Sequence, residues 1–374
     1  MLLLFPHFHA KIISTGRPVG ENLESAMRTG LSLTELAQKI ESNQVAKKDF
    51  ISSSQKLAAT VEHDQVKLVV PQHGHFPILP VAHDQIALHA KIPRDYYKRM
   101  AAEAPGLLTN NINEWFSRFP SDNKRMVRTM GGSARALLSN RYQRIENEEI
   151  AAVALPVLMD LPNVQIVSSE VTDRRLYIQF VVPGIQGEVK VGDVVQAGGI
   201  ISNSEVGFGS VSVEGLIWRL VCLNGMKRGE AFRRHHVGRK VDDSEALWAD
   251  DTKKADDKAV LLKVRDQVRA VVDQTRFAEN IRKLRDMTEG KITGDPAAAI
   301  EVLSQKVGAS DAEHGGILRS LIEGGDLSRF GIINAVTSQA HFATSYDRCV
   351  EFEGIGGSLV DLPANEWREI LEAA

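Results

Sequence analysis

The sequence has little of several features on which whole classes of protein depend. Only two of its 374 residues are cysteine, Cys222 and Cys349, and they lie far apart, so we expect no disulfide framework and no cysteine metal site. No apolar run approaches the length of a membrane-spanning helix, and the apolar start Met1–Phe5 is interrupted by His7 and Lys11 before it can form a signal peptide. These absences predict an intracellular, cytoplasmic protein without membrane contact.

Catalytic motifs are also missing. There is no Gly-x-Ser-x-Gly elbow and no His-Glu-x-x-His pair, and Gly207-Phe208-Gly209 lacks the Lys-Ser/Thr ending of a phosphate loop. Four histidines are close in sequence but have no cysteine or carboxylate at a ligand spacing, and we interpret them as turn residues: His73, His75, His83 and His89. The sequence favours a binding protein without catalytic centre, metal or cofactor.

Positive charge is concentrated in two segments of a chain whose net charge is -3. From Lys124 to Arg144 there are six basic residues and no acidic one, and from Arg219 to Lys240 there are seven basic residues against the single Glu230. Local basic surface on a globally neutral protein indicates an anionic partner, and nucleic acid is the commonest large anion in a cell.

The pattern of apolar residues and turn formers predicts an α+β fold built on an antiparallel sheet, with helical N- and C-terminal extensions. In the centre we expect a hairpin over 125–142, a helix over 148–161 after Asn147, a hairpin over 164–182, a strand pair over 193–213, and a buried helix over 213–223 that ends at Asn224–Gly225. In the turn of the second hairpin, Asp173 is expected to pair with Arg174 and Arg175.

The flanking regions read differently. Ser32 and Glu35 predict a capping box at the start of a short helix. Residues 246–257 read as an acidic linker, and Lys258–Met287 as one long amphipathic helix packed on the core. We therefore divide the chain into an N-terminal α+β region (1–120), a central sheet domain that binds nucleic acid (121–245) and a mainly helical region (246–374).

Several segments carry a resemblance to a known family: Arg125–Tyr142, Ile201–Gly207, Arg219–Met226, and more weakly Asn334–Thr337, Ser345–Asp347 and Glu353–Gly357. In this order they resemble the phage/plasmid-like family of unknown function (domain of unknown function nine-three-two) of mobile elements. The order of hairpin, helix, sheet and helix is similar to that of single-strand annealing proteins of phage recombination and of the eukaryotic Rad group. The resemblance implies a single-stranded DNA-binding and annealing protein of recombination or replication, which forms a homo-oligomeric ring or filament.

An annealing protein must hold phosphates and leave base edges free, so its groove needs arginine and lysine. The candidate nucleic-acid-binding residues are Arg125, Arg128, Arg135, Arg141, Tyr142, Arg144, Arg219, Lys227, Arg228, Arg233, Arg234, His235 and Arg239. Tyr142 or Phe208 would stack on a base. Arg135 is surrounded by apolar neighbours, which leaves open that it is buried and paired with Glu205 instead.

A second set of residues is interpreted as structural: Asn203, Ser204, Glu205, Gly207, Asn224 and Gly225. Asparagine and serine beside glycine build turns through side-chain to backbone hydrogen bonds. Glu205 is expected to order an arginine rather than touch a ligand, because a carboxylate repels phosphate.

Two alternative functions remain open. The first is a metal-dependent nuclease or phosphoryl-transfer enzyme that uses His235 and His236 with Asp242 or Asp243. The second is a host-takeover protein that binds another protein through the long helix over 258–287.

Overall fold

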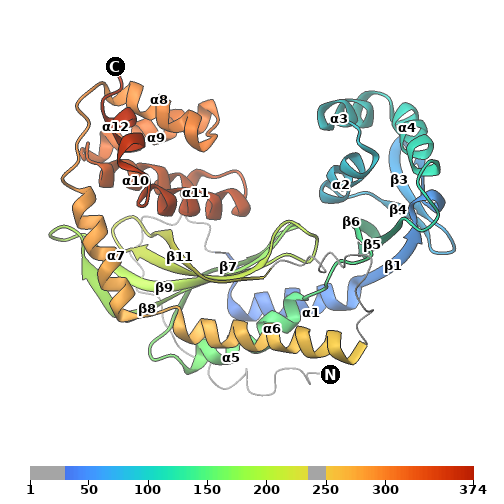
Figure 1. Ribbon diagram of the computed structural model, residues 1–374, viewed down its shortest axis with the longest axis horizontal. Helices are drawn as coiled ribbons and strands as arrows, with labels where there is room; N and C mark the ends of the chain where they lie inside the picture. Colours follow the sequence, from blue (N-terminus) through green and yellow to red (C-terminus); the bar gives the residue numbers. More distant parts are fainter. Residues whose placement is uncertain (1–29, 235–249) are drawn as a thin grey trace, which may run out of the picture.

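A five-stranded antiparallel sheet forms the base of the molecule, and two lobes rise from it on either side of a gap (Figure 1). The computed structural model describes residues 30–234 and 250–374. The sheet has the strand order β11-β10-β9-β8-β7. Its strands are β7 (Gln165–Val171), β8 (Leu176–Glu188), β9 (Val194–Asn203), β10 (Val211–Arg219) and β11 (Asn224–Arg234). The α+β class expected from the sequence is confirmed.

Three helices cover the lower face of this sheet in Figure 1: α1 (Leu33–Ala46), α5 (Asn147–Asp160) and α6 (Asp250–Ala270). Alternate residues of β8 point to this face, and Leu176, Ile178 and Phe180 are buried in one cluster with apolar residues of the three helices. The expected capping box is present at the start of α1, where Ser32 and Glu35 satisfy each other's backbone N–H groups.

The N-terminal lobe combines two small sheets with three helices. One sheet has the order β1-β5-β6 and the other β2-β3-β4. Their strands are β1 (Lys47–Ser53), β2 (Ala58–Glu62), β3 (Gln65–Val70), β4 (Gly74–Pro77), β5 (Lys124–Met130) and β6 (Ser133–Ser139), and the helices are α2 (Pro80–Ala90), α3 (Arg94–Glu103) and α4 (Pro105–Ser117). The hairpin that we expected to open the central domain thus completes a sheet begun by β1, and a boundary at residue 120 divides that sheet.

The C-terminal lobe is helical. After α7 (Gln274–Met287) it contains α8 (Pro296–Val307), α9 (Asp311–Gly324), α10 (Arg329–Ser338), α11 (Tyr346–Leu359) and α12 (Ala364–Leu371). Helix α11 lies on the upper face of the sheet, because Tyr177 and Gln179, which alternate with the downward residues of β8, hydrogen-bond to Asp347 and Glu353. The lobe is therefore attached to the sheet face opposite α6.

Three expectations about local structure are wrong. The segment expected to be a buried helix over 213–223 is strand β10 and a turn, because its β-branched and aromatic residues pair along their length with β9 and β11. The long helix expected over 258–287 is two helices, since Asp273 caps the start of α7 by accepting a hydrogen bond from the Arg276 backbone N–H at 2.7 Å. Helix α6 also begins at Asp250, inside the segment expected to be a linker.

Within the described ranges, no helix is both long enough and apolar enough to cross a membrane.

Candidate functional site

Arg128, a leading candidate for phosphate binding, lies in the interior. Its side chain is 2% exposed. Its Nε donates to Asp49 Oδ1 at 2.9 Å, its Nη1 donates to the backbone oxygen of Glu205 at 2.8 Å, and its Nη2 pairs with Glu146. All three nitrogens are occupied and shielded from solvent. The expectation that Arg128 lines a groove is therefore wrong.

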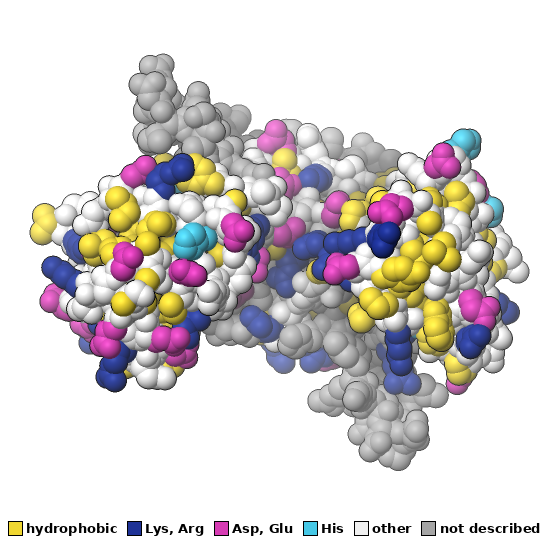
Figure 2. Space-filling view, turned by 90° about the horizontal axis from the view of Figure 1, so that it is seen from above, with side chains coloured by type: hydrophobic (Ala, Val, Ile, Leu, Met, Phe, Trp, Pro, Cys, Tyr) yellow, Lys and Arg dark blue, Asp and Glu magenta, His cyan; other side chains and the backbone are white. Residues whose placement is uncertain are grey.

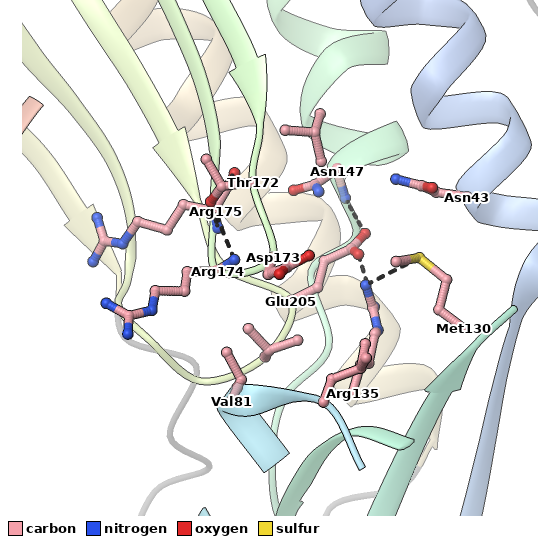
Figure 3. A pocket seen from close by; sticks show the side chains of 13 residues that line it. Asn43, Val81, Met130, Arg135, Asn147, Thr172, Asp173, Arg174, Arg175 and Glu205 are labelled. Carbon is pink, nitrogen blue, oxygen red and sulfur yellow. Dashed lines mark hydrogen bonds and ion pairs between the residues drawn. The ribbon is translucent and has the colours of Figure 1, made fainter. Parts of the chain in front are cut away.

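Arg135 and Glu205 form the buried ion pair that the sequence left open. Arg135 Nη2 lies 2.8 Å from Glu205 Oε2, and the other carboxylate oxygen accepts hydrogen bonds from Lys47 Nζ and from the Asn147 backbone N–H, each at 2.8 Å. Figure 3 shows Glu205 between Arg135 and Asn147. Arg135 is thus withdrawn from any surface groove, and Glu205 has the structural role expected of it.

We call this network of Lys47, Asp49, Arg128, Arg135, Glu146 and Glu205 the N-terminal junction. Burial opposes the ionisation of Glu205, but the charges of Arg135 and Lys47 outweigh it and hold the pKa of Glu205 well below its ordinary value. Burial and the neighbouring Glu205 raise the pKa of Glu146. The junction joins β1, β5 and β6 to α5 and to the loop after β9.

That loop, residues 203–209, is shaped by the motif residues as expected. Asn203 Nδ2 donates to the Ile145 backbone oxygen at 2.9 Å and to Asn147 Oδ1 at 2.8 Å, and Ser204 Oγ accepts from the Phe208 backbone N–H at 2.9 Å. Gly207 has a φ of +80°, and a Cβ there would lie 2.7 Å from Leu138 Cδ2. Only glycine fits this position.

Tyr142 stabilises the same loop. Its hydroxyl donates to the Ser204 backbone oxygen at 2.7 Å, its ring packs against an apolar cluster, and burial raises the pKa of its hydroxyl. Tyr142 is therefore a packing residue, and it is not placed as the base-stacking platform that we considered.

The basic residues of the second segment that line the far end of the sheet are also paired. Arg219 makes two hydrogen bonds of 2.7 Å to the carboxylate of Asp193. Arg228 Nη1 lies 2.7 Å from Asp361 Oδ2 and donates to the Gly357 backbone oxygen at 2.7 Å. Lys227 Nζ lies 3.5 Å from Glu214 Oε1. Arg219 is thus held to the turn between β8 and β9, and the buried Arg228 holds the C-terminal end of α11 to the sheet. Both arginines are engaged within the protein and are not placed as a free phosphate groove.

A second junction joins the C-terminal lobe to the sheet. We call Gln179, Asn224, Gly225, Thr337 and Glu353 the C-terminal junction. Asn224 Nδ2 donates to Thr337 Oγ1 at 2.8 Å, and Glu353 accepts from Gln179 Nε2 at 2.6 Å and from the Gly225 N–H at 3.3 Å. Asn224 thus begins a strand and anchors α10, instead of ending a helix. A Cβ on Gly225 would lie 2.8 Å from the Glu353 carboxylate.

Glu353 is almost completely buried, at 2% exposure. Burial raises its pKa to about 7, because its two hydrogen-bond donors and the more distant Lys227 compensate only part of the lost hydration. The C-terminal junction therefore holds a carboxyl group that is partly protonated at neutral pH.

An open cleft of about 590 Å³ lies between the C-terminal lobe and the sheet. Its walls are the turn between β7 and β8 on one side and the N-terminal ends of α9 and α11 on the other, with the lining residues Arg174, Ser310, Glu313, Asp347, Arg348 and Glu351. In Figure 2 the molecule is hollowed between the two lobes, and Lys and Arg side chains gather there with some Asp and Glu among them.

The acidic groups of this cleft are already occupied. Arg348 makes two contacts of 2.8 Å to Glu313 and one of 2.8 Å to Glu351. Asp347 Oδ1 accepts hydrogen bonds from the hydroxyls of Tyr177 at 2.9 Å and Thr172 at 3.1 Å. Among the residues that the structure describes, this leaves Arg174 as the cation of the cleft lining that makes no ion pair.

Arg174 stands over an aromatic ring. Its guanidinium carbon lies 4.9 Å from the centroid of the Phe208 ring, and the side chain is exposed. Arg175 fixes the position of Phe208, because its Nε donates to the Phe208 backbone oxygen at 2.9 Å. The expectation that Asp173 pairs with Arg174 and Arg175 is wrong, since these two arginines turn to Phe208 and its backbone. The contact between Arg174 and Phe208 could not be seen in the sequence, because the two residues are 34 positions apart. They meet only when the turn between β7 and β8 lies beside the loop between β9 and β10.

The remaining candidates are scattered. Arg125 is half-buried, Arg141 and Arg233 are exposed, Arg144 is exposed and 3.1 Å from Asp49, and Arg234 lies 2.8 Å from Asp256. His235 and Arg239 lie outside the described residues, as do His236, Asp242 and Asp243 of the nuclease alternative.

The four clustered histidines have separate environments. His73 stacks on Phe50, His75 pairs with Glu62, His83 meets the hydroxyl of Tyr97, and His89 stacks on Phe119. His83 and His89 lie in α2 and not in turns. Among the described residues, no three His, Cys, Asp or Glu side chains are grouped as a metal ion requires.

No family model, no curated protein and no solved structure matches this chain. The resemblance to the phage/plasmid-like family therefore stays a prediction from the sequence motifs.

Proposed function

We propose that this protein binds single-stranded DNA in the cleft between its sheet and its C-terminal lobe, as a strand-annealing protein of recombination or replication would. The observation that carries the proposal is the exposed Arg174 stacked on Phe208 at the cleft wall. An arginine plane held by an aromatic ring offers stacking to a base and positive charge to its phosphate.

The arrangement favours unpaired strands over duplex. Stacking on a protein side chain requires a base whose face is free, which a base inside a duplex does not offer. Stacking is also tolerant of sequence, because every base has an aromatic face. A protein that anneals strands needs this kind of contact, since it leaves the Watson–Crick edges unread.

Neither alternative function gains support from a specific observation. The residues of the proposed nuclease site lie outside the described ranges. The apolar stripe of the long-helix segment is buried against the protein's own core, through Val260, Val264 and Val268 of α6 and Phe277 and Ile281 of α7. That stripe is therefore not available to a partner protein.

Fluorescence anisotropy with a labelled oligo-dT strand tests the proposal, with a second Arg–aromatic pair as control. At the C-terminal end of α4, Arg118 lies 5.5 Å from the Trp115 ring, and α4 lies on the outer side of the N-terminal lobe in Figure 1. We expect Phe208→Leu to weaken binding by up to about 1–3 kcal/mol, the usual worth of one base stack, because the ring no longer holds the Arg174 plane on which the base would stack. Trp115→Leu should leave binding unchanged.

Salt dependence separates charge from stacking. Arg174→Ala should lower the slope of log affinity against log salt by about 0.7, because one phosphate contact is lost, and Arg118→Ala should not. Absence of binding at low salt, preference for duplex, or equal losses in the cleft pair and the control pair would each contradict the proposal.

A further inference from the structure

Arg125 differs from Arg128, the other arginine of strand β5. Side chains alternate along β5, and Val127 packs into the apolar cluster with α2 and α4 while Arg128 turns to the N-terminal junction. Arg125 shares the face of Val127, and its charge acts on His89 of α2. The arginine therefore projects toward the helices of the N-terminal lobe and away from the junction.

The guanidinium of Arg125 has no counterion within residues 30–234 and 250–374. The side chain is half-buried, its Nε is buried without a hydrogen-bond partner, and desolvation lowers its pKa. By contrast, the buried Arg128, Arg135 and Arg228 each contact a carboxylate. A guanidinium that is half-withdrawn from water and makes no ion pair gains from contact with an anion.

His89 completes the surroundings without adding charge. Its Nε2 lies 2.8 Å from Ser54 Oγ, and that hydroxyl donates to Asn123 Oδ1 at 2.8 Å. The hydroxyl proton is thus used, so His89 Nε2 is the donor and Nδ1 is left as an acceptor. Burial, and then the charge of Arg125, lower the pKa of His89 to about 4, so the imidazole is neutral at pH 7.

We propose that Arg125 forms a binding site for a phosphate-type oxyanion beside His89 in the N-terminal lobe. The planar fork of a guanidinium matches two phosphate oxygens, and the lowered hydration of this side chain strengthens the contact. The phosphate comes either from a free small ligand or from a nucleic-acid strand. The site does not depend on the cleft, because it uses none of the cleft residues.

The His89 ring reports occupancy, because an anion at Arg125 cancels the charge that lowers its pKa. The experiment follows the His89 Cε1–H resonance by NMR through pH titrations of the full chain, with increasing inorganic phosphate at constant ionic strength. We expect the pKa of His89 to rise and to saturate with phosphate. In Arg125→Gln the pKa of His89 should already be higher without phosphate, and added phosphate should not change it. Arg99→Gln, an exposed arginine on α3, should behave like the native chain.

The proposed site would be refuted if the pKa of His89 does not change with phosphate, if it rises without saturating, or if it changes equally in Arg125→Gln. An oligo-dT arm identifies the source of the phosphate. A shift at micromolar strand assigns the phosphate to nucleic acid, and a shift with inorganic phosphate alone assigns it to a small ligand. A saturating phosphate response in a chain that fails to bind oligo-dT would refute the cleft proposal and leave the Arg125 site standing.

Discussion

The two lobes are attached to one sheet by junctions of opposite chemistry. At the N-terminal junction three cations and three carboxylates meet in the interior, and Glu205 remains ionised between Arg135 and Lys47. At the C-terminal junction Glu353 is buried among neutral donors, and the close approach of α11 to β11 depends on glycine. The comparison teaches that two buried carboxyl groups of one fold respond oppositely to pH: the cations around Glu205 outweigh the cost of its burial, whereas the contacts of Glu353 are neutral donors and do not.

The sign of each response follows from linkage. The folded-state pKa of Glu205 lies below its unfolded value, so its contribution to stability is present above the unfolded pKa and is lost as pH falls through the folded value. The folded-state pKa of Glu353 lies above its unfolded value, so stability is lost as pH rises from about 4.5 to about 7. We therefore expect acid to remove the stabilising contribution of Glu205, and neutral or alkaline pH to weaken the C-terminal junction through Glu353.

Arg128→Met should give the largest effect at either junction. It leaves Asp49 and Glu146 without their buried partner, and breaking a buried ion pair in this way typically costs about 3–5 kcal/mol of unfolding free energy. Arg144→Ala is the matched control, because Arg144 also contacts Asp49 but is 55% exposed, and an exposed pair contributes at most about 1 kcal/mol. Urea denaturation at pH 7 measures the unfolding free energy of both variants. Equal losses of unfolding free energy in Arg128→Met and Arg144→Ala would show that the junction is not a buried network.

Glu353→Gln should stabilise the protein at high pH and have little effect in acid. The native carboxyl costs up to ~3 kcal/mol when ionised, from a pKa raised from 4.5 to about 7 at about 1.4 kcal/mol per unit, and glutamine removes that cost. Unfolding free energies at pH 5 and pH 8.5 provide the test. Glu351→Gln, an exposed neighbour on α11, is the control. The explanation fails if the gain is the same at both pH values.

Gly357→Ala should weaken the C-terminal junction through shape alone. A Cβ at Gly357 would lie 1.7 Å from the Lys227 backbone oxygen, so α11 must move away from β11, at a cost of about 1–3 kcal/mol. Gly315→Ala, in α9 with open space around its Cα, should instead stabilise by about 0.5–1 kcal/mol. Thermal melts of the two variants that shift in the same direction would contradict this account of the helix contact.

Much of the fold was predictable, because it depends on local signals. The capping box of α1, the glycine turn of the β5–β6 hairpin and helix α5 all follow from short-range patterns. Strand β10 could not be predicted from short-range patterns, because its apolar run is compatible with a helix as well as with a strand. Only pairing with β9 and β11 decides for the strand. The break between α6 and α7 was likewise missed because Asp273 gives only a weak capping signal.

The candidate site was less predictable than the fold. The Arg135–Glu205 pair could be expected from the apolar neighbours of Arg135. The burial of Arg128 could not, because its partner Asp49 is 79 residues away on β1. An acid-poor segment indicates a basic surface only if its arginines find no carboxylates elsewhere in the chain, and here most of them do.

Cross-linking tests most directly whether the cleft between the sheet and the C-terminal lobe binds a strand. An oligo-dT strand carrying 5-iodouracil, irradiated on the native chain and mapped by mass spectrometry, should attach at Phe208 and its neighbours, and Arg174→Ala should reduce the yield there. Cross-links confined to the Trp115 region, or a yield at Phe208 that is unchanged in Arg174→Ala, would contradict the proposal that single-stranded DNA lies in this cleft.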